Sequence, residues 1–175
     1  MINMKNLIFS EEADYREAYL IAKIQFKKII KNFNENDFRS NFDELFYDKK
    51  NYKLFLKNGD KLLCGALGFV YENKVFIDIF FWDFLFNDYD MNIVRLFFER
   101  FFQETTKINV NEAILPLDKH RKKFESFKKH NQTFFRSCEE LQSNDRLINE
   151  LYYHHHLLKV NYKNYYEQKQ KSNIC

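Results

Sequence analysis

The supply of glycine constrains this chain more than any other feature of its sequence. Only three glycines and one proline occur among 175 residues, where average usage would give roughly 12 and 9. All three glycines, Gly59, Gly65 and Gly68, lie in one short central segment. A loop that cradles phosphate groups needs backbone that no side chain crowds. The sequence therefore has room for at most one glycine-rich phosphate loop.

The rest of the composition describes a folded chain. Aromatic residues make up 19% of the sequence and hydrophobic residues 45%, which excludes collagen-like repeats and intrinsic disorder as the default. The length predicts a single domain, which we place at residues 1–160, followed by a polar C-terminal tail at 161–175. The net charge of +3 gives no reason to expect a nucleic-acid partner.

Cysteine usage and hydropathy predict a cytoplasmic protein. The cysteines are odd in number and have no CxxC spacing (Cys64, Cys138 and Cys175), so we expect no disulfide framework and no metal site. Cys64 and Cys138 lie in predicted strands, where we expect buried, inert thiols. The N-terminal apolar run is too short for a signal peptide. The longest apolar run, Val75–Phe86, contains Asp78 and Asp83, and nothing approaches a membrane span.

The N-terminal half alternates helical and strand-like patterns. A strand is predicted at Met4–Phe9, and a helix at Glu11–Lys31 with Ser10 as its N-cap. A shorter helix follows around Phe38–Tyr47, and then a three-stranded meander at Tyr52–Leu56, Lys61–Tyr71 and Val75–Trp82. Asn58-Gly59 predicts the first hairpin turn. Gly65 and Gly68, inside the second strand, predict a bulge or the close approach of another backbone.

The C-terminal half continues the mixture of elements. A helix is predicted at Met91–Thr105, a strand at Asn111–Leu117, a basic helix at Asp118–His130, and strands at Thr133–Cys138 and Leu151–Val160. The tail from Asn161 onward is polar and compatible with a frayed helix. The order β-α-α-β-β-β-α-β-α-β-β predicts a mixed α+β domain.

Three segments in this order resemble the Gcn5-related N-acetyltransferase (GNAT) superfamily. They are LFLKNGDKLLCGALGFVYENKVFIDIFF, similar to the family's central meander, INVNEAILPLDKHRKKFESFKKHNQTFF, similar to its fifth strand and fourth helix, and INELYYHHHLLKV, similar to its last strand. The resemblance implies a mixed, mostly antiparallel sheet of about six to seven strands flanked by about four helices. It also implies an N-acyltransferase that moves an acyl group from acetyl-CoA or another acyl-CoA to an amine of a small molecule or protein.

The motif that binds pyrophosphate in this family is degenerate here. The family's Q/R-x-x-G-x-G/A turn falls on Asn87-Asp88-Tyr89-Asp90-Met91-Asn92, where Asp90 and Asn92 replace the glycines. Carboxylates about 4 to 6 Å from phosphates would cost on the order of 1 kcal/mol each. The resemblance assigns donor binding to six positions (Phe81, Asn87, Tyr89, Met91, Asn92 and Lys119).

The catalytic positions also depart from the family. The tyrosine that serves as general acid in many members falls on Phe127, which cannot donate a proton, so Tyr152 and Tyr153 are the substitutes. The resemblance places the general base on the fourth or fifth strand, where Asp78 and Asp83 on the fourth, or Glu112 on the fifth, are the candidates. It also lets a backbone amide of the fourth strand polarise the thioester carbonyl. Asp78 lies in an apolar run, so it is either paired or functional, or else it faces solvent or bonds a neighbouring strand.

Several alternatives stay open at this level. His154 and His156 would share one face of a strand with His155 opposite, but the sequence nominates no third metal ligand. The resemblance places the basic helix near the adenine and 3′-phosphate end of the cofactor, so its charge is compatible with an acyl-CoA donor. It is equally compatible with an acidic acyl-carrier protein, with RNA, or with a solvated helix surface. The chain is either an acyltransferase or a non-catalytic GNAT-fold binding module that has lost coenzyme A. A homodimer is compatible with the sequence, which does not specify the oligomeric state.

Overall fold

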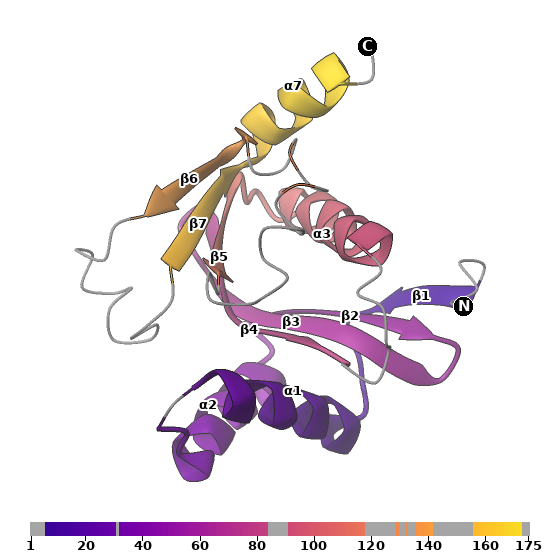
Figure 1. Ribbon diagram of the computed structural model, residues 1–175, viewed down its shortest axis with the longest axis vertical. Helices are drawn as coiled ribbons and strands as arrows, with labels where there is room; N and C mark the ends of the chain where they lie inside the picture. Colours follow the sequence, from indigo (N-terminus) through magenta and orange to yellow (C-terminus); the bar gives the residue numbers. More distant parts are fainter. Residues whose placement is uncertain are drawn as a thin grey trace. The chain divides into compact units, whose positions relative to one another are not determined.

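The computed structural model describes residues 6–30, 32–83, 91–117, 129, 132, 136–141 and 156–172. Its strands are β1 (Leu7–Ser10), β2 (Tyr52–Asn58), β3 (Lys61–Tyr71), β4 (Lys74–Trp82), β5 (Glu112–Leu117), β6 (Cys138–Leu141) and β7 (His156–Asn161). Its helices are α1 (Tyr15–Ile29), α2 (Glu35–Tyr47), α3 (Met91–Thr106) and α7 (Tyr162–Ser172). The predicted α+β class is therefore confirmed (Figure 1).

The strands form one seven-stranded sheet in the order β1-β2-β3-β4-β5-β7-β6. The β1–β2, β2–β3, β5–β7 and β6–β7 pairs are antiparallel. The β4–β5 pair is parallel, and its register joins Lys74, Val75 and Phe76 to Glu112, Ala113 and Ile114. This mostly antiparallel sheet confirms the predicted architecture.

The contacts within the chain form two compact units. One comprises Met1–Phe69 with Ile77–Tyr89, and the other Val70–Phe76 with Asp90–Cys175. Strands β3 and β4 each contribute to both units. The domain limits predicted from the sequence, 1–160 and 161–175, stay a prediction.

Both helices of the first unit begin at a side-chain cap. The Asp14 carboxylate accepts a hydrogen bond from the Glu17 amide at 2.8 Å, and the Asn34 side chain accepts from the two amides at positions 36 and 37. The prediction of Ser10 as the cap of the first helix was wrong. Ser10 ends β1, and its hydroxyl accepts from the Glu12 amide in the connecting turn. The helix starts later because an aspartate satisfies its first-turn amides at least as well as a serine.

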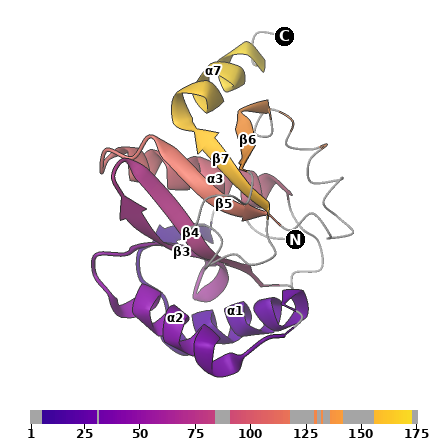
Figure 2. The same ribbon diagram turned by 90° about the vertical axis from the view of Figure 1, so that its left-hand side faces the viewer.

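Helices α1 and α2 lie side by side on one face of β2, β3 and β4, as both ribbon views show (Figures 1 and 2). The core between these layers is mostly aromatic and aliphatic. Its buried residues are Ala18, Tyr19, Ala22, Phe38, Phe42, Leu45, Phe55, Leu62, Leu67, Ile79 and Phe81. Small alanines on α1 let the helix approach the sheet, while the large rings of α2 fill the remaining space.

Gly59 and Gly65 are glycines for different physical reasons. Gly59 has φ of +61° in the β2–β3 turn, a conformation that side chains disfavour. A Cβ on Gly65 would lie 2.6 Å from ring atoms of both Phe55 and Phe81. The close approach predicted at Gly65 is therefore by aromatic rings and not by another backbone.

The predicted bulge in this strand lies at a different residue. The register steps from Leu56↔Cys64 to Lys57↔Leu62, so β3 has one extra residue, Leu63. The Leu62 amide donates to the Glu17 carboxylate of α1 at 3.1 Å, in place of the ladder bond that a bulge disrupts.

In the second unit, α7 packs on α3 through aromatic side chains. The ring centroids of Phe102 and Tyr162 are 4.8 Å apart, and the ring centroid of Tyr165 lies 5.3 Å from that of Phe102. The hydroxyls of Thr105 and Tyr162 share a hydrogen bond of 2.7 Å. Burial raises the pKa of Tyr162 well above its ordinary value. Most of the predicted polar tail is thus an anchored helix.

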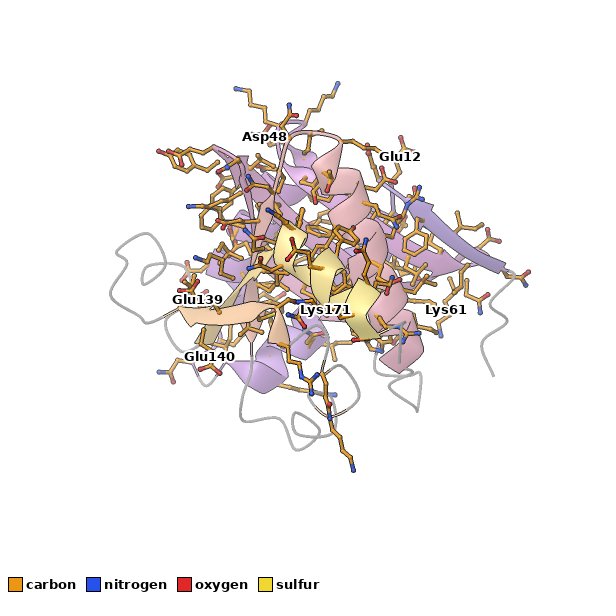
Figure 3. The ribbon with its side chains drawn as sticks, turned by 90° about the horizontal axis from the view of Figure 1, so that it is seen from above. Glu12, Asp48, Lys61, Glu139, Glu140 and Lys171 are labelled. Carbon is orange, nitrogen blue, oxygen red and sulfur yellow. The ribbon has the colours of Figure 1, made fainter. Side chains whose placement is uncertain are left out.

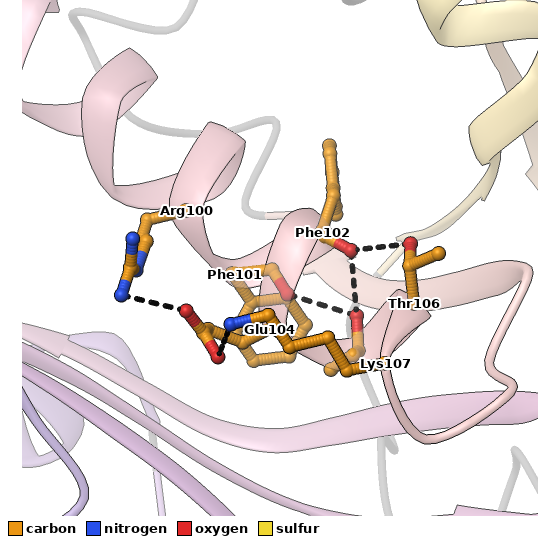
Figure 4. A network of polar contacts seen from close by, with 7 residues as sticks. Arg100, Phe101, Phe102, Glu104, Thr106 and Lys107 are labelled. Carbon is orange, nitrogen blue, oxygen red and sulfur yellow. Dashed lines mark hydrogen bonds and ion pairs between the residues drawn. The ribbon is translucent and has the colours of Figure 1, made fainter.

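The last two turns of α3 hold a polar network (Figure 4). Glu104 forms ion pairs with Arg100 at 2.7 Å and Lys107 at 2.8 Å, and Lys107 holds the pKa of this carboxyl below its usual range. The Thr106 hydroxyl donates to the Phe102 carbonyl. These contacts lie within one helix and its end, so they stabilise α3 locally.

One strand near the C-terminus differs in position from the prediction. The strand predicted at Thr133–Cys138 is β6, Cys138–Leu141. Strand β7, His156–Asn161, overlaps the strand predicted at Leu151–Val160, whose first five residues lie outside the described residues. Glu139 of β6 forms an ion pair with Lys159 of β7, and both Glu139 and Glu140 are exposed (Figure 3). Apart from Lys129, the predicted basic helix lies outside the described residues. No described helix is long and apolar enough to cross a membrane.

Candidate functional site

The end of β4 carries the predicted site residues that the structure describes. Asp78, Phe81 and Asp83 lie on or directly after this strand. Met91 and Asn92 are described only as the first two residues of α3. The other predicted positions lie outside the described residues, namely Asn87, Tyr89, Lys119, Tyr152 and Tyr153, with His154 and His155.

Asp78 is a buried carboxylate with a hydrogen bond from α2. Its residue is only 6% exposed, so the alternative in which it faces solvent is wrong. The Asn41 side-chain amide donates to Asp78 Oδ2 at 2.6 Å. A buried carboxylate needs such donors, because burial without them costs several kcal/mol. The sequence indicated a partner for Asp78 but gave no signal for Asn41.

Asp83 has a different environment. Its amide donates to the Leu63 carbonyl of β3 at 2.8 Å, which continues the β3–β4 contact past the end of the strand. Its carboxylate lies 3.3 Å from the ammonium of Lys61, whose side chain is 51% exposed (Figure 3). The ion pair ties the start of β3 to the end of β4.

Phe81 is a core residue. Its side chain is fully buried in the cluster beneath α1 and α2, and its ring centroid lies 6.4 Å from that of Phe55. The side chain is committed to this core, so the donor-binding role predicted for Phe81 is compatible only with its main chain.

Sequence reasoning missed a contact between a glutamine of α1 and the main chain of β4. The Gln25 carboxamide of α1 donates to the Phe80 carbonyl and accepts from the Trp82 amide, both at 2.8 Å. Gln25 is 4% exposed. It follows Ala18 and Ala22 on the apolar face of α1. A glutamine on an apolar stripe was the available signal, because such a residue needs partners.

The Gln25 amide lies along the edge of β4 that faces away from β3. Successive residues of a strand direct their main-chain groups to opposite edges. The Asp83 amide donates to Leu63 on β3, whereas the Trp82 amide donates to Gln25. At Phe80 and Trp82 a side chain therefore makes the pair of bonds that a neighbouring strand would make.

The described thiols have no reactive environment. Burial raises the pKa of Cys64 well above its ordinary value, and it raises the pKa of Cys138 to about 12. This agrees with the prediction of inert cysteines. Among the described residues there is no group of three or more His, Cys, Asp or Glu that could hold a metal ion.

Comparison with known proteins identifies the fold. No family model and no curated protein matches the sequence. Solved structures do match. A GNAT-family acetyltransferase from Staphylococcus aureus has a TM-score of 0.64 at 12% identity, covering 89% of this chain and 99% of that one. The chain has the GNAT fold.

Two other GNAT-fold structures extend the comparison. The PaiA N-acetyltransferase from Thermoplasma acidophilum, solved with coenzyme A, has a TM-score of 0.60 at 11% identity, covering 89% of this chain and 99% of that one. An Escherichia coli N-acetyltransferase that acts on an alanine of a ribosomal protein has a TM-score of 0.58 at 14% identity, covering 89% and 93%. At these identities the likeness shows the fold alone.

The described residues allow one test of whether an acyl-CoA fits. The pantetheine arm of coenzyme A contains secondary amides, each with one N–H and one C=O. The Phe80 carbonyl and Trp82 amide already bind one amide, the Gln25 carboxamide, through both groups. The chain's own side chain thus acts as a stand-in, and the main chain at this position fits an amide ligand.

Proposed function

We propose that this GNAT-fold protein is an N-acyltransferase that uses an acyl-CoA donor and an amine acceptor. The observation that supports it is Asp78, a buried carboxylate on β4 with an amide donor to orient it. The resemblance assigns the general base to this strand or to β5. Acyl-CoA, when bound, supplies a thioester carbonyl that a deprotonated amine attacks.

In the proposed mechanism Asp78 accepts a proton from the acceptor amine. The Asn41 amide, as a donor, holds Oδ2 and fixes the plane of the carboxylate. A carboxylate has about four lone-pair sites, so the bond from Asn41 does not by itself prevent Asp78 from accepting a proton. Asp83 already has an ion pair with Lys61, and we assign it to anchoring the end of β4. Tyr152 or Tyr153 remains the proposed proton donor to the thiolate.

The acceptor is proposed at the level of a small-molecule or protein amine. Similar structures include an enzyme that acetylates an alanine of a ribosomal protein and an N-acetylglutamate synthase from Neisseria gonorrhoeae. An acyl-carrier protein as donor, docking on segment 118–130, also stays a prediction.

Release of free coenzyme A from acetyl-CoA, measured over a panel of amines and peptides, tests this function. We expect Asp78→Asn to lower kcat/KM by about 10²- to 10⁴-fold, the range for loss of a general base. Asp60→Asn, at an exposed turn position, is the matched control and should leave the rate unchanged. Equal rates for wild type and Asp78→Asn would contradict the assignment.

A second candidate is a non-catalytic GNAT-fold binding module. The Gln25 carboxamide favours the binding module, because Gln25 occupies main-chain groups on β4. The carboxylates of the degenerate loop, Asp88 and Asp90, also favour the binding module. Calorimetry with acetyl-CoA separates the two candidates. No heat of binding at millimolar donor, with wild type and Gln25 variants alike, would favour the module.

A further inference from the structure

The Gln25 side chain binds β4 as a strand residue would. It offers one donor and one acceptor to the carbonyl of one residue and the amide of the residue two positions on. Any extended ligand that pairs with this part of β4 needs the same two groups. A ligand and Gln25 therefore cannot bind Phe80 and Trp82 through these bonds at the same time.

We propose that Gln25 is a built-in competitor at an amide-binding position on β4, so that an acyl donor pairs with this strand only after Gln25 has left it. This inference rests on the proposed acyl-CoA function, and it makes Gln25 a specificity-determining residue. A donor without an extended, amide-bearing arm gains nothing from displacing the carboxamide. A pantetheine-type arm replaces both of the bonds that it breaks.

The rest of α1 does not depend on Gln25. Ala18 and Ala22 are fully buried against the sheet, and the Glu17 carboxylate separately holds the Leu62 amide of β3. The glutamine side chain has several rotatable bonds, so it can leave β4 by rotation while the helix remains in place.

The size of the effect follows from the two bonds. Each typical hydrogen bond contributes a net factor of about five to an equilibrium constant, so competition by both lowers donor affinity by up to about 30-fold. Removing the carboxamide should therefore tighten donor binding by about 5- to 30-fold. Gln25→Ala also opens space, so Gln25→Met is the second variant, because it keeps the length of the side chain but cannot form these bonds.

Calorimetric titration of the full chain with acetyl-CoA, and separately with pantetheine, tests the proposal. Gln103→Ala, at an exposed position on α3, is the control and should bind like wild type. Tighter binding by both Gln25 variants supports the proposal. So does a shift of the Gln25 side-chain NH₂ resonance when labelled wild-type protein is saturated with either probe, which is a readout independent of activity and of the variants' folding.

Failure of the competitor role and failure of the proposed acyl-CoA function give different results. If wild type binds acetyl-CoA, the folded Gln25→Met variant binds no more tightly and the Gln25 resonance does not move, the competitor role is wrong and the proposed function stands. If neither wild type nor either variant binds at millimolar concentration, the acyl-CoA function itself fails, and the inference falls with it. If only the variants bind, both are supported.

Discussion

Replacing Gly65 with alanine tests the packing around β4 directly. The new Cβ would lie 2.6 Å from Phe55 Cδ1 and 2.6 Å from Phe81 Cζ, well inside van der Waals contact. The rings come from β2 and β4, on either side of β3, and both are fully buried. Neither ring can move without displacing the α1–α2 core, because protein interiors are close-packed.

We expect Gly65→Ala to destabilise the protein by about 2 to 3 kcal/mol, near the upper end for overpacking. For a chain of this length that corresponds to a fall in Tm of about 4 to 12 °C. Gly59→Ala is the contrast, since nothing lies within 4 Å of its Cβ but its φ is +61°. It should cost about 1 kcal/mol through backbone strain alone. Urea denaturation measures both free energies of unfolding.

A double-mutant cycle identifies the cause. Phe81→Leu removes ring atoms that Gly65→Ala would strike, so the double variant should be more stable than the sum of the single effects by about 1 kcal/mol or more. Phe81→Leu with Gly59→Ala should be additive. A Gly65→Ala cost below about 0.5 kcal/mol, or additivity with Phe81→Leu, would refute the packing argument.

Two further predictions concern the carboxylate and the thiols. Asn41→Leu should lower the free energy of unfolding by about 1 to 3 kcal/mol, because the buried Asp78 carboxylate loses a donor; denaturation at neutral pH measures this, and an unchanged stability would show that Asn41 does not support Asp78. Native Cys138 should react slowly with a thiol reagent near pH 8 and quickly in urea, since its raised pKa of about 12 suppresses the thiolate. Because the pKa of Cys138 is higher in the folded protein than in the unfolded chain, the contribution of this thiol to stability should decline as pH rises from about 9 to about 12. Equal labelling rates for the native and the unfolded protein would contradict the slow native reaction and this pH dependence alike.

Local patterns in the sequence were sufficient for most elements of the fold. Helical periodicity predicted α1 and α3, and the Asn58-Gly59 turn predicted the β2–β3 hairpin. Helix α2 differs from the prediction only by an earlier start, at Glu35. These features are determined by neighbours a few residues apart, such as caps and turn conformations. The strand near residue 138 was misplaced, because a short apolar run does not specify where a ladder begins.

The candidate site likewise has features that the sequence determined and features that only the tertiary structure determined. The apolar run around Asp78 determined that this carboxylate would need a partner, and the positions of the three glycines determined that no glycine-rich loop follows β4. The partners themselves come from far along the chain. Asn41 is 37 residues from Asp78, and Gln25 is 55 and 57 residues from the β4 groups that it binds. Only the packing of α1 and α2 on the sheet brings these groups together, because a side chain's hydrogen-bond partner depends on tertiary contacts and not on local periodicity.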